Sequence, residues 1–253
     1  MLVLLPPSEG KSVPRRGRPL DLGTLSFPEL TATRRRIADT LVELCSSDPD
    51  KAADVLGLGP TQADALARDA TLWTQPTARA DAVYDGVLYA ALDLGTLDPA
   101  ARRRASRSLA FASALFGLVR PADRIPAYRL SGNVTLPELG TIASQWRDQL
   151  GPVVAGVVGS GLLVDLRSST YAALWKPDGP KERIATVRVL HESVGRRTVV
   201  SHFNKATKGR IVRALLAEGA SPRTVSALAD VLRDLGWTVE QHGSRLDVVV
   251  TEV

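Results

Sequence analysis

The sequence predicts a mixed α/β (α+β) fold, a single domain over residues 1–253 in which helices flank a mixed β-sheet. Three observations lead to this fold class. An unbroken apolar run opens the chain, a block of helical patterns follows it, and short β-branched runs dominate the part after Pro121. Hydrophobic residues make up 44% of the chain, and no internal repeat or low-complexity linker marks a domain boundary.

One strand and four helices are predicted in the first half of the chain. Leu2 to Leu5 is apolar throughout and is followed by two prolines, which is typical of a buried strand. Asp48 supplies a cap residue directly before Pro49, so a helix is predicted to begin there. The predicted order is a strand over 2–5, a Pro-, Gly- and Arg-rich loop over 11–28, and helices over 28–46, from 49, over 79–93 and over 99–118.

Short strands and two helices are predicted in the second half. The strand patterns are β-branched runs bounded by Gly, Pro, Asp or Ser. Ser221 before Pro222 is expected to cap the last helix, and alternating runs around Gly243-Ser244 predict a terminal hairpin. Strands are predicted over 153–158, 162–166, 184–190, 198–203, 237–241 and 245–253, and helices over 205–218 and 222–235.

The content of cysteine, histidine and long apolar runs excludes several classes of protein. Cys45 is the only cysteine, so the chain forms no intrachain disulfide and offers zinc no cysteine cluster. The three histidines, at 191, 202 and 242, show no ligand spacing, so we expect no metal site, no cofactor and no direct iron storage. No signal peptide and no apolar run of about 20 residues is present, which predicts a cytoplasmic protein without a membrane partner.

The charge of the chain points towards a polyanionic partner. The net charge is +5 and the pI is about 9.6. Basic residues are concentrated in the windows 10–20, 100–130 and 201–213, which together contain one acid, Asp123. Two interpretations stay open at this stage: a surface that binds a polyanion, and a solvated arginine-rich surface that binds nothing.

A glycine-containing turn lies between two predicted helices. Gly57 and Gly59 have the spacing of the helix-hairpin-helix element of DNA repair and replication proteins. Two glycines permit a turn with positive φ and leave backbone N–H groups and a helix N-terminus facing a phosphate. Asp64 and Asp69 on the following helix oppose that role, so a purely structural turn is the alternative. Either way, at least one of the two glycines is expected to adopt a positive φ.

Polar loops at the ends of predicted strands form the main candidate site. Residues 6–11 follow the first strand directly, where α/β proteins usually bind ligands, but they lack the earlier glycine and the helix of a Walker motif. Arginine offers phosphate a rigid donor fork, and tyrosine offers a stacking face. The candidates for DNA or phosphate binding are Lys11, Arg120, Arg124, Tyr128, Arg129, Ser168, Tyr171, Lys176, Lys205, Lys208 and Arg210.

We expect these residues to form one basic cleft, although they lie far apart in the sequence. Each sits at the end of a predicted element, where no apolar packing demands it. The sharpest form of this prediction is that one contiguous cleft is lined by Lys11, Arg120, Tyr128, Tyr171, Lys205 and Arg210.

Five segments resemble a known family in their order along the chain. They are Pro-Pro-Ser-Glu-Gly-Lys at 6–11, Tyr-Asp-Gly-Val-Leu-Tyr at 84–89, Gly-Leu-Val-Arg-Pro at 117–121 with Tyr-Arg-Leu at 128–130, Asp-Leu-x-Ser-Ser-x-Tyr at 165–171, and Lys-x-x-Lys-Gly-Arg at 205–210. Together these segments resemble the YaaA peroxide-stress family over essentially the whole chain. The resemblance implies one α+β domain with a basic cleft and a helix-hairpin-helix-like element. It also implies DNA binding without strong sequence preference, and protection from hydrogen peroxide linked to free iron.

Two functional hypotheses of different classes follow. The first is a DNA-binding protein of the YaaA type, which limits free iron and DNA damage in the response to peroxide. The alternative is an enzyme acting on a nucleotide-like or phosphorylated small molecule in the same cleft, where Glu9, Asp85 or Asp165 supplies the acid or base beside Ser168 and Tyr171. Carboxylates converging on an enclosed pocket would favour the enzyme, and an open cationic groove would favour DNA.

Overall fold

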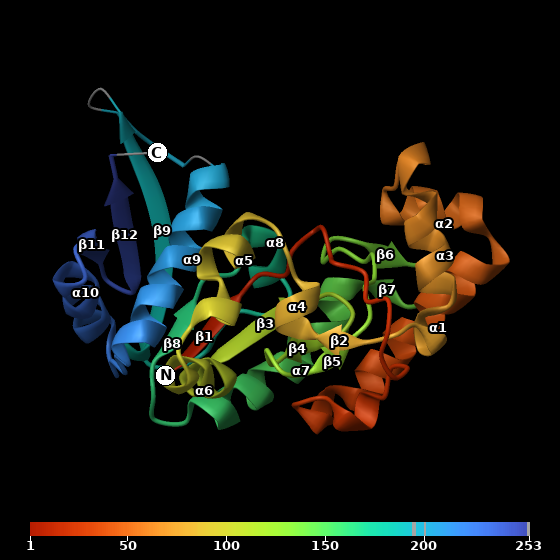
Figure 1. Cartoon of the computed structure of the whole chain (residues 1–253), viewed down its shortest axis with the longest axis horizontal. Coiled ribbons are helices and arrows are strands. Elements are labelled where there is room, and N and C mark those ends of the chain that lie inside the picture. The colour runs from red at the N-terminus through yellow and green to blue at the C-terminus, as the bar shows by residue number, and fades with distance from the viewer. Residues whose placement is uncertain (194–195, 200, 252–253) are drawn as a thin grey trace.

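A mixed β-sheet forms the centre of the molecule (Figure 1). The computed structural model describes residues 1–193, 196–199 and 201–251, apart from the side chains of Pro60 and of residues 201–203. Within these residues the sheet has eight strands, namely β1 (Leu2–Leu5), β3 (Leu109–Ser113), β4 (Gly117–Val119), β8 (Leu163–Asp165), β9 (Ile184–Ser193), β10 (Arg196–Thr198), β11 (Thr238–His242) and β12 (Arg245–Val250).

The strand order is β11-β12-β9-β8-β1-β3-β4, and β10 pairs with β9 outside this path. The five strands from β12 to β3 run parallel to one another. The strands β4, β10 and β11 pair antiparallel with their neighbours. The predicted mixed sheet flanked by helices is therefore confirmed.

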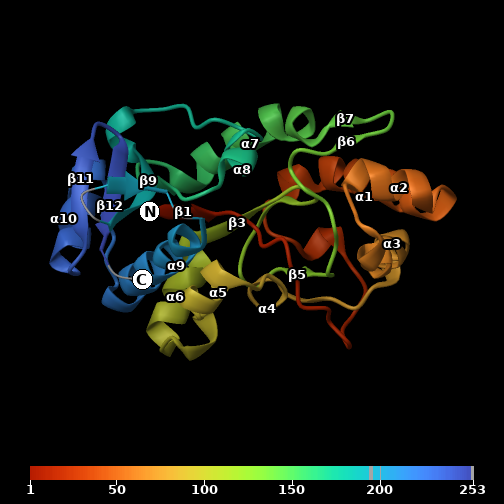
Figure 2. The same cartoon turned by 90° about the horizontal axis from the view of Figure 1, so that it is seen from above.

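Helices cover both faces of this sheet (Figure 2). They are α1 (Thr31–Ser47), α2 (Pro49–Leu56), α3 (Ala63–Ala70), α4 (Ala80–Val83), α5 (Val87–Leu92), α6 (Pro99–Ser108), α7 (Ile142–Val158), α8 (Ser169–Ala172), α9 (Ser201–Glu218) and α10 (Val225–Asp234). One face carries α6 and α9, with α5 packed on α9, and the opposite face carries α7. The helices α1 to α3 form the end of the molecule remote from α10 (Figure 1).

Two small two-stranded sheets complete the fold. The first pairs β2 (Ala78–Arg79) with β5 (Arg124–Ile125), and the second pairs β6 (Thr135–Leu136) with β7 (Gly140–Thr141). Among the described residues, no helix combines the length and the apolar character that a membrane span requires.

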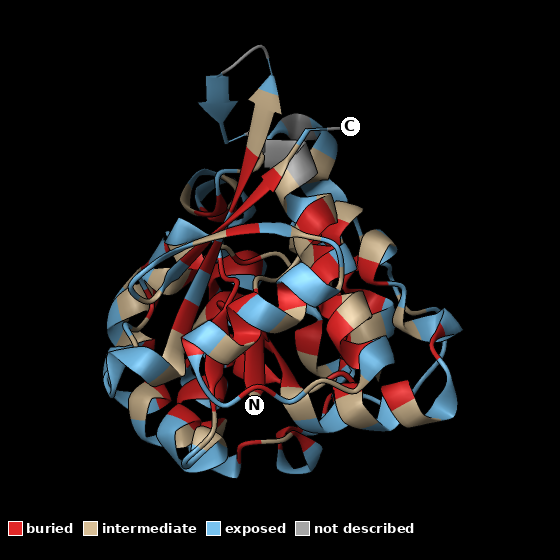
Figure 3. Ribbon diagram, turned by 90° about the vertical axis from the view of Figure 1, so that its left-hand side faces the viewer, coloured by how far each residue is buried: buried red, intermediate tan, exposed pale blue. Residues whose placement is uncertain are grey.

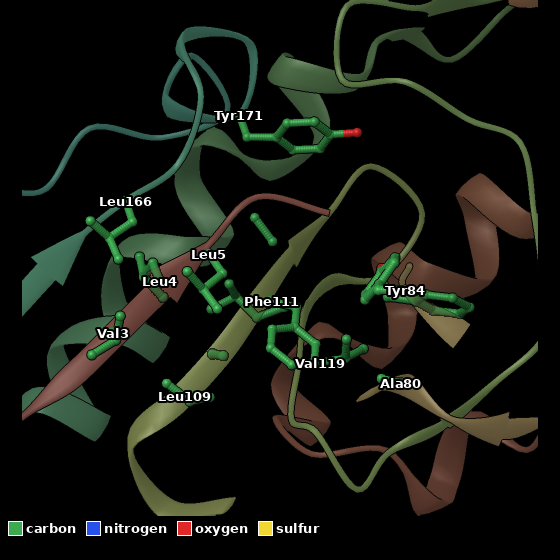
Figure 4. Close-up of a cluster of buried hydrophobic side chains, with 14 of the residues drawn as sticks. Val3, Leu4, Leu5, Ala80, Tyr84, Leu109, Phe111, Val119, Leu166 and Tyr171 are labelled. Atoms are coloured by element: carbon green, nitrogen blue, oxygen red, sulfur yellow. The ribbon is translucent and has the colours of Figure 1, made fainter. Parts of the chain in front are cut away.

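The predicted first strand is confirmed as β1, at the centre of the parallel part of the sheet. Val3 is level with Leu109 on one side and with Val164 on the other. All four residues of β1 are at most 1% exposed, because helices lie over both faces (Figures 3 and 4). A strand buried on both faces of a parallel sheet is expected to be continuously apolar, as this run is.

The helix predicted over 99–118 is wrong in its second half. The helix α6 ends at Ser108, and the chain continues as β3 and β4, joined by a short turn. The run from Leu109 to Phe116 is almost entirely apolar, and a short buried strand cannot be distinguished from a buried helix by such a pattern. Gly117 adopts φ +69° at the start of β4, where a β-carbon would lie 2.8 Å from Cζ3 of Trp146.

Two predicted strands are wrong. Residues 153–158 form the last turns of α7, which contains Pro152 within the helix. The strand was predicted from the β-branched valines of this run, which favour strands but here lie in a helix. Residues 198–203 are not one strand, because β10 ends at Thr198 and α9 begins at Ser201, four residues before the predicted helix start.

Two helix predictions need smaller corrections. The helix over 79–93 is divided into α4 and α5, because Gly86 adopts φ +88° between them. The last helix begins at Val225 rather than at 222, and the Thr224 hydroxyl, not Ser221, accepts the capping hydrogen bond from Ala227 N. The remaining predictions, α1, α2, β8, β9 and the β11–β12 hairpin, are confirmed to within a few residues.

Gly117 provides a test of this packing. Gly117→Ala should lower the free energy of unfolding by about 2 kcal/mol or more, because a left-handed backbone and a contact with Trp146 both disfavour a β-carbon. Gly156→Ala is the matched control: it lies within α7 with nothing within 4 Å, so the same change should stabilise by about 0.5–1 kcal/mol. Urea denaturation measures both variants, and equal effects would contradict this account of the β3–β4 turn.

Candidate functional site

Two adjoining cavities lie at the edge of the sheet where β1 and β8 end. The strand-end cavity has a volume of about 270 Å³, and the hairpin cavity has a volume of about 590 Å³. Both are lined by Glu9 and Gly10, so the loop that follows β1 forms their common wall. The polar residues lining the strand-end cavity are Ser8, Glu9, Asp85, Tyr89, Ser168, Tyr171 and Lys205. Those lining the hairpin cavity are Glu9, Lys11, Thr61, Gln62, Asp64, Arg68, Tyr128 and Arg129.

The loop that carries Lys11 is fixed against the segment before α5. The backbone of Lys11 forms a β-bridge with Tyr84, and Ser12 N donates to Val83 O at 2.9 Å. The Ser8 hydroxyl accepts a hydrogen bond from Asp85 N, and the Ser12 hydroxyl donates to Asp85 Oδ2 at 3.2 Å. These contacts hold the loop across the carboxyl end of β1 and thereby determine the position of Lys11.

The Lys11 ammonium lies between a carbonyl and two aromatic rings. Its Nζ donates to Ser8 O at 3.0 Å and lies 4.3 Å from the ring centroid of Tyr128 and 5.7 Å from that of Tyr84. Burial lowers the pKa of Lys11 to about 8, against the opposite effect of Glu9. At pH 7 this side chain is therefore mostly charged, and about a tenth of it is the uncharged amine.

Tyr128 is buried and belongs to a chain of hydroxyl groups. Its hydroxyl lies 2.9 Å from that of Tyr84 and 2.7 Å from that of Ser113, whose oxygen in turn accepts from Phe116 N. The Tyr84 ring also packs edge-on against Phe111 (Figure 4). The Tyr128 ring packs against Lys11. Because Tyr128 is only 4% exposed, it offers little surface on which a nucleic-acid base could stack.

A buried carboxylate joins α3 to the loop that carries Arg129. Asp69 is completely buried and accepts the backbone N–H of Arg129 with both oxygens, at 3.0 and 3.2 Å. Burial raises the pKa of Asp69 to about 7, although this hydrogen bond and the charge of Lys11 act in the opposite direction. The Arg129 guanidinium pairs with Glu9 at 3.0 Å on the rim of the hairpin cavity.

Four of the six residues predicted to share a cleft line the two cavities. Lys11 and Tyr128 line the hairpin cavity, whereas Tyr171 and Lys205 line the strand-end cavity. Tyr171 lies beyond the end of β1 (Figure 4) and is 4% exposed, whereas Lys205 is exposed in the first part of α9. Two further candidates also line the cavities, namely Ser168 before α8 and Arg129.

Arg120 and Arg124 lie elsewhere. Both Arg107 O and Leu109 O accept hydrogen bonds from the Arg120 guanidinium, at 2.8 Å each. Leu109 begins β3, which runs parallel to β1, so Arg120 lies at the opposite edge of the sheet from the cavities. Arg124 donates to Thr77 O at 2.6 Å. The prediction that Arg120 shares the cleft is therefore wrong, because backbone carbonyls hold it at the far edge.

The other cationic candidates are dispersed. Lys208 donates to Leu166 O at 3.2 Å, which ties α9 to the segment after β8. Arg210 on α9 and Lys176 after Trp175 are both exposed and line neither cavity, so the expectation that Arg210 lines the cleft is wrong. Between these cations, Gly209 packs so closely on α5 that a β-carbon would lie 2.3 Å from Leu88 O.

The three candidate carboxylates separate into two groups. Glu9 and Asp85 line the strand-end cavity with Lys205. Asp165 is buried and forms a two-fold hydrogen-bonded ion pair with Arg167, at 2.9 and 2.7 Å, which in turn donates to Tyr171 O. Asp165 therefore holds the backbone of α8 in place and is not directed at a ligand.

The glycine turn next to the hairpin cavity satisfies its own amides. Gly57 adopts φ +63°, which confirms the predicted positive φ, whereas Gly59 has φ −82°. Gly57 N donates to Asp54 O, Leu58 N to Ala53 O at 2.8 Å, and Gly59 N to the Gln62 side chain at 3.2 Å. Because these three amides already have acceptors, the geometry favours a structural turn over a phosphate cradle.

Sequence reasoning missed Arg68, which lines the hairpin cavity, and did not predict that Asp69 is buried behind that cavity against Arg129 N. Arg68 lies outside the three basic windows, so charge clustering did not indicate it. Asp69 occupies the same buried face as Ala65 and Leu72, and an acid at that spacing was the available signal. Among the described residues, no three His, Cys, Asp or Glu side chains come together as the ligands of a metal ion would.

Comparison with known proteins assigns the family. A sequence model described as peroxide stress protein YaaA matches residues 1–242. The chain belongs to the YaaA family. It is 52% identical to a UPF0246 protein of Streptomyces coelicolor, with both chains covered completely. It is also 43% identical to a UPF0246 protein of Corynebacterium efficiens over the whole of both chains, and 40% identical to one of Corynebacterium glutamicum strain R over 99% of this chain and all of that one.

Most of the segments that resemble the YaaA family meet at the two cavities, whereas residues 117–121 line neither of them. Residues 6–11 form the wall between them, the segments at 84–89 and 165–171 line the strand-end cavity, and Tyr128 and Arg129 line the hairpin cavity. Lys205 adds the start of the α9 segment. Four of the five YaaA-like segments, and the Tyr128-Arg129 part of the fifth, therefore contribute to one region, although the sequence separates them by up to about 200 residues.

Asp69 predicts a pH dependence of stability. Its pKa is raised from the ordinary value of 3.8 to about 7, so the folded chain retains a proton that the unfolded chain loses. Stability should therefore fall as the pH rises from 4 to 7, by up to about 1.4 kcal/mol per pH unit. Asp69→Asn keeps an acceptor for Arg129 N and should remove this fall, as measured by urea denaturation between pH 5 and 8.

Asp64→Asn is the control, since this exposed acid lies on the same helix. It should retain the pH profile of the unmodified chain. Parallel profiles for Asp69→Asn and the unmodified chain would show that Asp69 is ionised in the folded protein throughout this range.

Proposed function

We propose that this YaaA-family chain binds the phosphate backbone of DNA along the two adjoining cavities. The observation that carries the proposal is that cations from four separate segments line one continuous polar region. These cations are Lys11, Arg68, Arg129 and Lys205. Contacts of lysine and arginine with phosphate oxygens carry no base information, so we expect largely sequence-independent binding.

Three acids, Glu9, Asp64 and Asp85, line the same region and oppose the binding of phosphate. Glu9 pairs with Arg129 in the absence of ligand, and its side chain is 60% exposed. A phosphate approaching Arg129 therefore competes with the Glu9 carboxylate for the same guanidinium. Asp64 and Asp85 add further negative charge, so binding depends on a few directed cations more than on a uniformly positive surface.

We further propose that DNA contact underlies a role in the peroxide stress that the family description names. The limitation of free iron is part of the same proposal, as an effect downstream of DNA binding. The single thiol is a poor candidate for sensing peroxide directly, because burial raises the pKa of Cys45 to about 12 and the thiolate is the reactive form.

A second candidate function is supported by the strand-end cavity. Its volume of about 270 Å³ is close to the lower limit for small-ligand pockets, and it combines Glu9 and Asp85 with Lys205. These groups suit a nucleotide-like or phosphorylated small molecule. Calorimetric titration with a nucleoside monophosphate, compared between the unmodified chain and Asp85→Asn, would test this alternative.

Salt dependence tests the DNA proposal. Four cations at phosphates should give a slope of log K against log[salt] of about −3 to −4, since each contact contributes about −0.9. Lys205→Ala should weaken binding to all duplex sequences alike and reduce the slope by about one unit. Lys51→Ala, an exposed lysine on α2 that lines neither cavity, is the control. Fluorescence anisotropy provides the measurement, and salt-independent binding would contradict the proposal.

The competition between Glu9 and phosphate gives a prediction of opposite sign. Glu9→Gln should tighten duplex binding roughly two- to fivefold, because Arg129 no longer has to exchange an exposed ion pair for a phosphate. Glu182→Gln removes the same charge from an exposed position outside both cavities and should have a smaller effect. Equal effects in the two variants would mean that only net charge matters and that Arg129 does not contact the phosphate.

A further inference from the structure

Lys11 differs from the other lysines of the chain in its surroundings. The sequence contains six lysines, at 11, 51, 176, 181, 205 and 208. Lys208 donates to a backbone carbonyl, and the remaining four are exposed. Only Lys11 combines a partly buried ammonium, a contact with aromatic rings and a place in the wall of a cavity.

Lys11 also lacks an ion pair within the described part of the chain. Its ammonium donates a hydrogen bond to Ser8 O, and no carboxylate of the described residues lies within 4.0 Å of Nζ. The charged groups that act on it from a greater distance are Glu9, Asp69 and Asp85, which favour the ammonium, and Arg129, which opposes it. An amine that is not held by a carboxylate can lose its proton and turn its lone pair towards the cavity.

We propose that Lys11 is a nucleophilic amine that forms an imine with the aldehyde of a sugar phosphate bound in the hairpin cavity. The neutral amine attacks the aldehyde carbon, so that a C–N bond forms and the carbonyl oxygen takes up a proton. The resulting carbinolamine loses water to leave a C=N bond, and no oxidant or reductant is required. The lowered pKa of Lys11, about 8, supplies the neutral amine that this step needs near pH 7.

The surroundings of Lys11 indicate the class of aldehyde. Arg68 and Arg129 line the same cavity and suit a phosphate, while Thr61 and Gln62 offer groups that hydrogen-bond sugar hydroxyls. The volume of about 590 Å³ accommodates a sugar with its phosphate. The shared chemistry is an open-chain sugar aldehyde next to a phosphate, which occurs both in a free aldose phosphate and at a baseless site in DNA. The DNA source rests on the DNA binding proposed above.

Reductive trapping tests the proposal. The full chain is incubated at saturating concentration with a duplex containing one baseless site, with deoxyribose 5-phosphate, or with intact duplex, each with cyanoborohydride. Peptide mass mapping then locates the stable secondary amine among the six lysines and the N-terminus. We expect modification of Lys11 at least tenfold above any other amine with one or both aldehydes, and none with intact duplex. Modification spread over the exposed lysines would overturn the proposal.

Two lysine variants test whether the trapped amine is that of Lys11. Lys11→Arg keeps a cation but has no nucleophilic amine, so trapping at residue 11 should be abolished, and circular dichroism confirms that it folds. Lys181→Arg, exposed and outside both cavities, should trap like the unmodified chain. Undiminished trapping in Lys11→Arg would overturn the proposal. Should Lys11→Arg fail to fold, the pH profile of the unmodified chain decides.

In that profile the trapping rate at Lys11 should rise about tenfold from pH 6 to 7 and level off above pH 8. A rate that keeps rising tenfold per unit to pH 10 would indicate an ordinary lysine and overturn the proposal. Anisotropy with intact duplex separates this inference from the proposed function. Trapping of the free sugar phosphate without duplex binding refutes DNA binding alone, and duplex binding without trapping of either aldehyde refutes the imine alone.

Discussion

The burial of β1 on both faces is the constraint on which the rest of the structure depends. Both faces of β1 are covered, so all four of its residues are apolar and the polar residues begin only beyond its end. Its carboxyl end therefore passes directly into the loop at 6–11, which is anchored where Pro6 O accepts the hydroxyl of Tyr89 at 2.6 Å. The cavities lie at this edge because the loops that follow β1 and β8 both begin there.

Buried polar side chains connect the block of α1 to α3 to this central sheet. Arg34 on α1 is completely buried and donates to Phe116 O and Leu118 O, at 2.9 and 2.7 Å, on either side of the turn into β4. Asp69 on α3 accepts from Arg129 N. Both groups form hydrogen bonds with backbone atoms of other segments, so they fix α1 and α3 in position against the rest of the fold. As a result, the wall of the hairpin cavity that comes from α3 has a defined place opposite Lys11.

Much of the fold could be predicted from the sequence, and the failures have physical causes. The strand β1 and the helices α1 and α2 were predictable because a short run ended by prolines and a capped helix start are local signals. The strand β3 was not, since its apolar run gains its conformation only by pairing with β1. In the site, Lys11, Tyr171 and Lys205 were predictable from their positions at strand and helix ends. The prediction for Arg120 was wrong because the sequence does not show which backbone carbonyls accept hydrogen bonds from its guanidinium.

The hydrogen bonds of Arg120 show why the net charge of +5 is a poor measure of the cationic surface. Many arginines donate to backbone carbonyls at the ends of helices and strands, where the backbone lacks partners. Arg104 donates to Leu216 O at 2.7 Å near the end of α9, and Arg213 to Leu92 O and Asp93 O at the end of α5. Arg120 does the same where α6 passes into β3. These cations stabilise the fold, so a basic composition overstates the positive surface left for a ligand. Among the residues that the structure describes, only four of the remaining cations, Lys11, Arg68, Arg129 and Lys205, line the two cavities, so the proposed binding depends on the geometry of these few groups rather than on the overall charge.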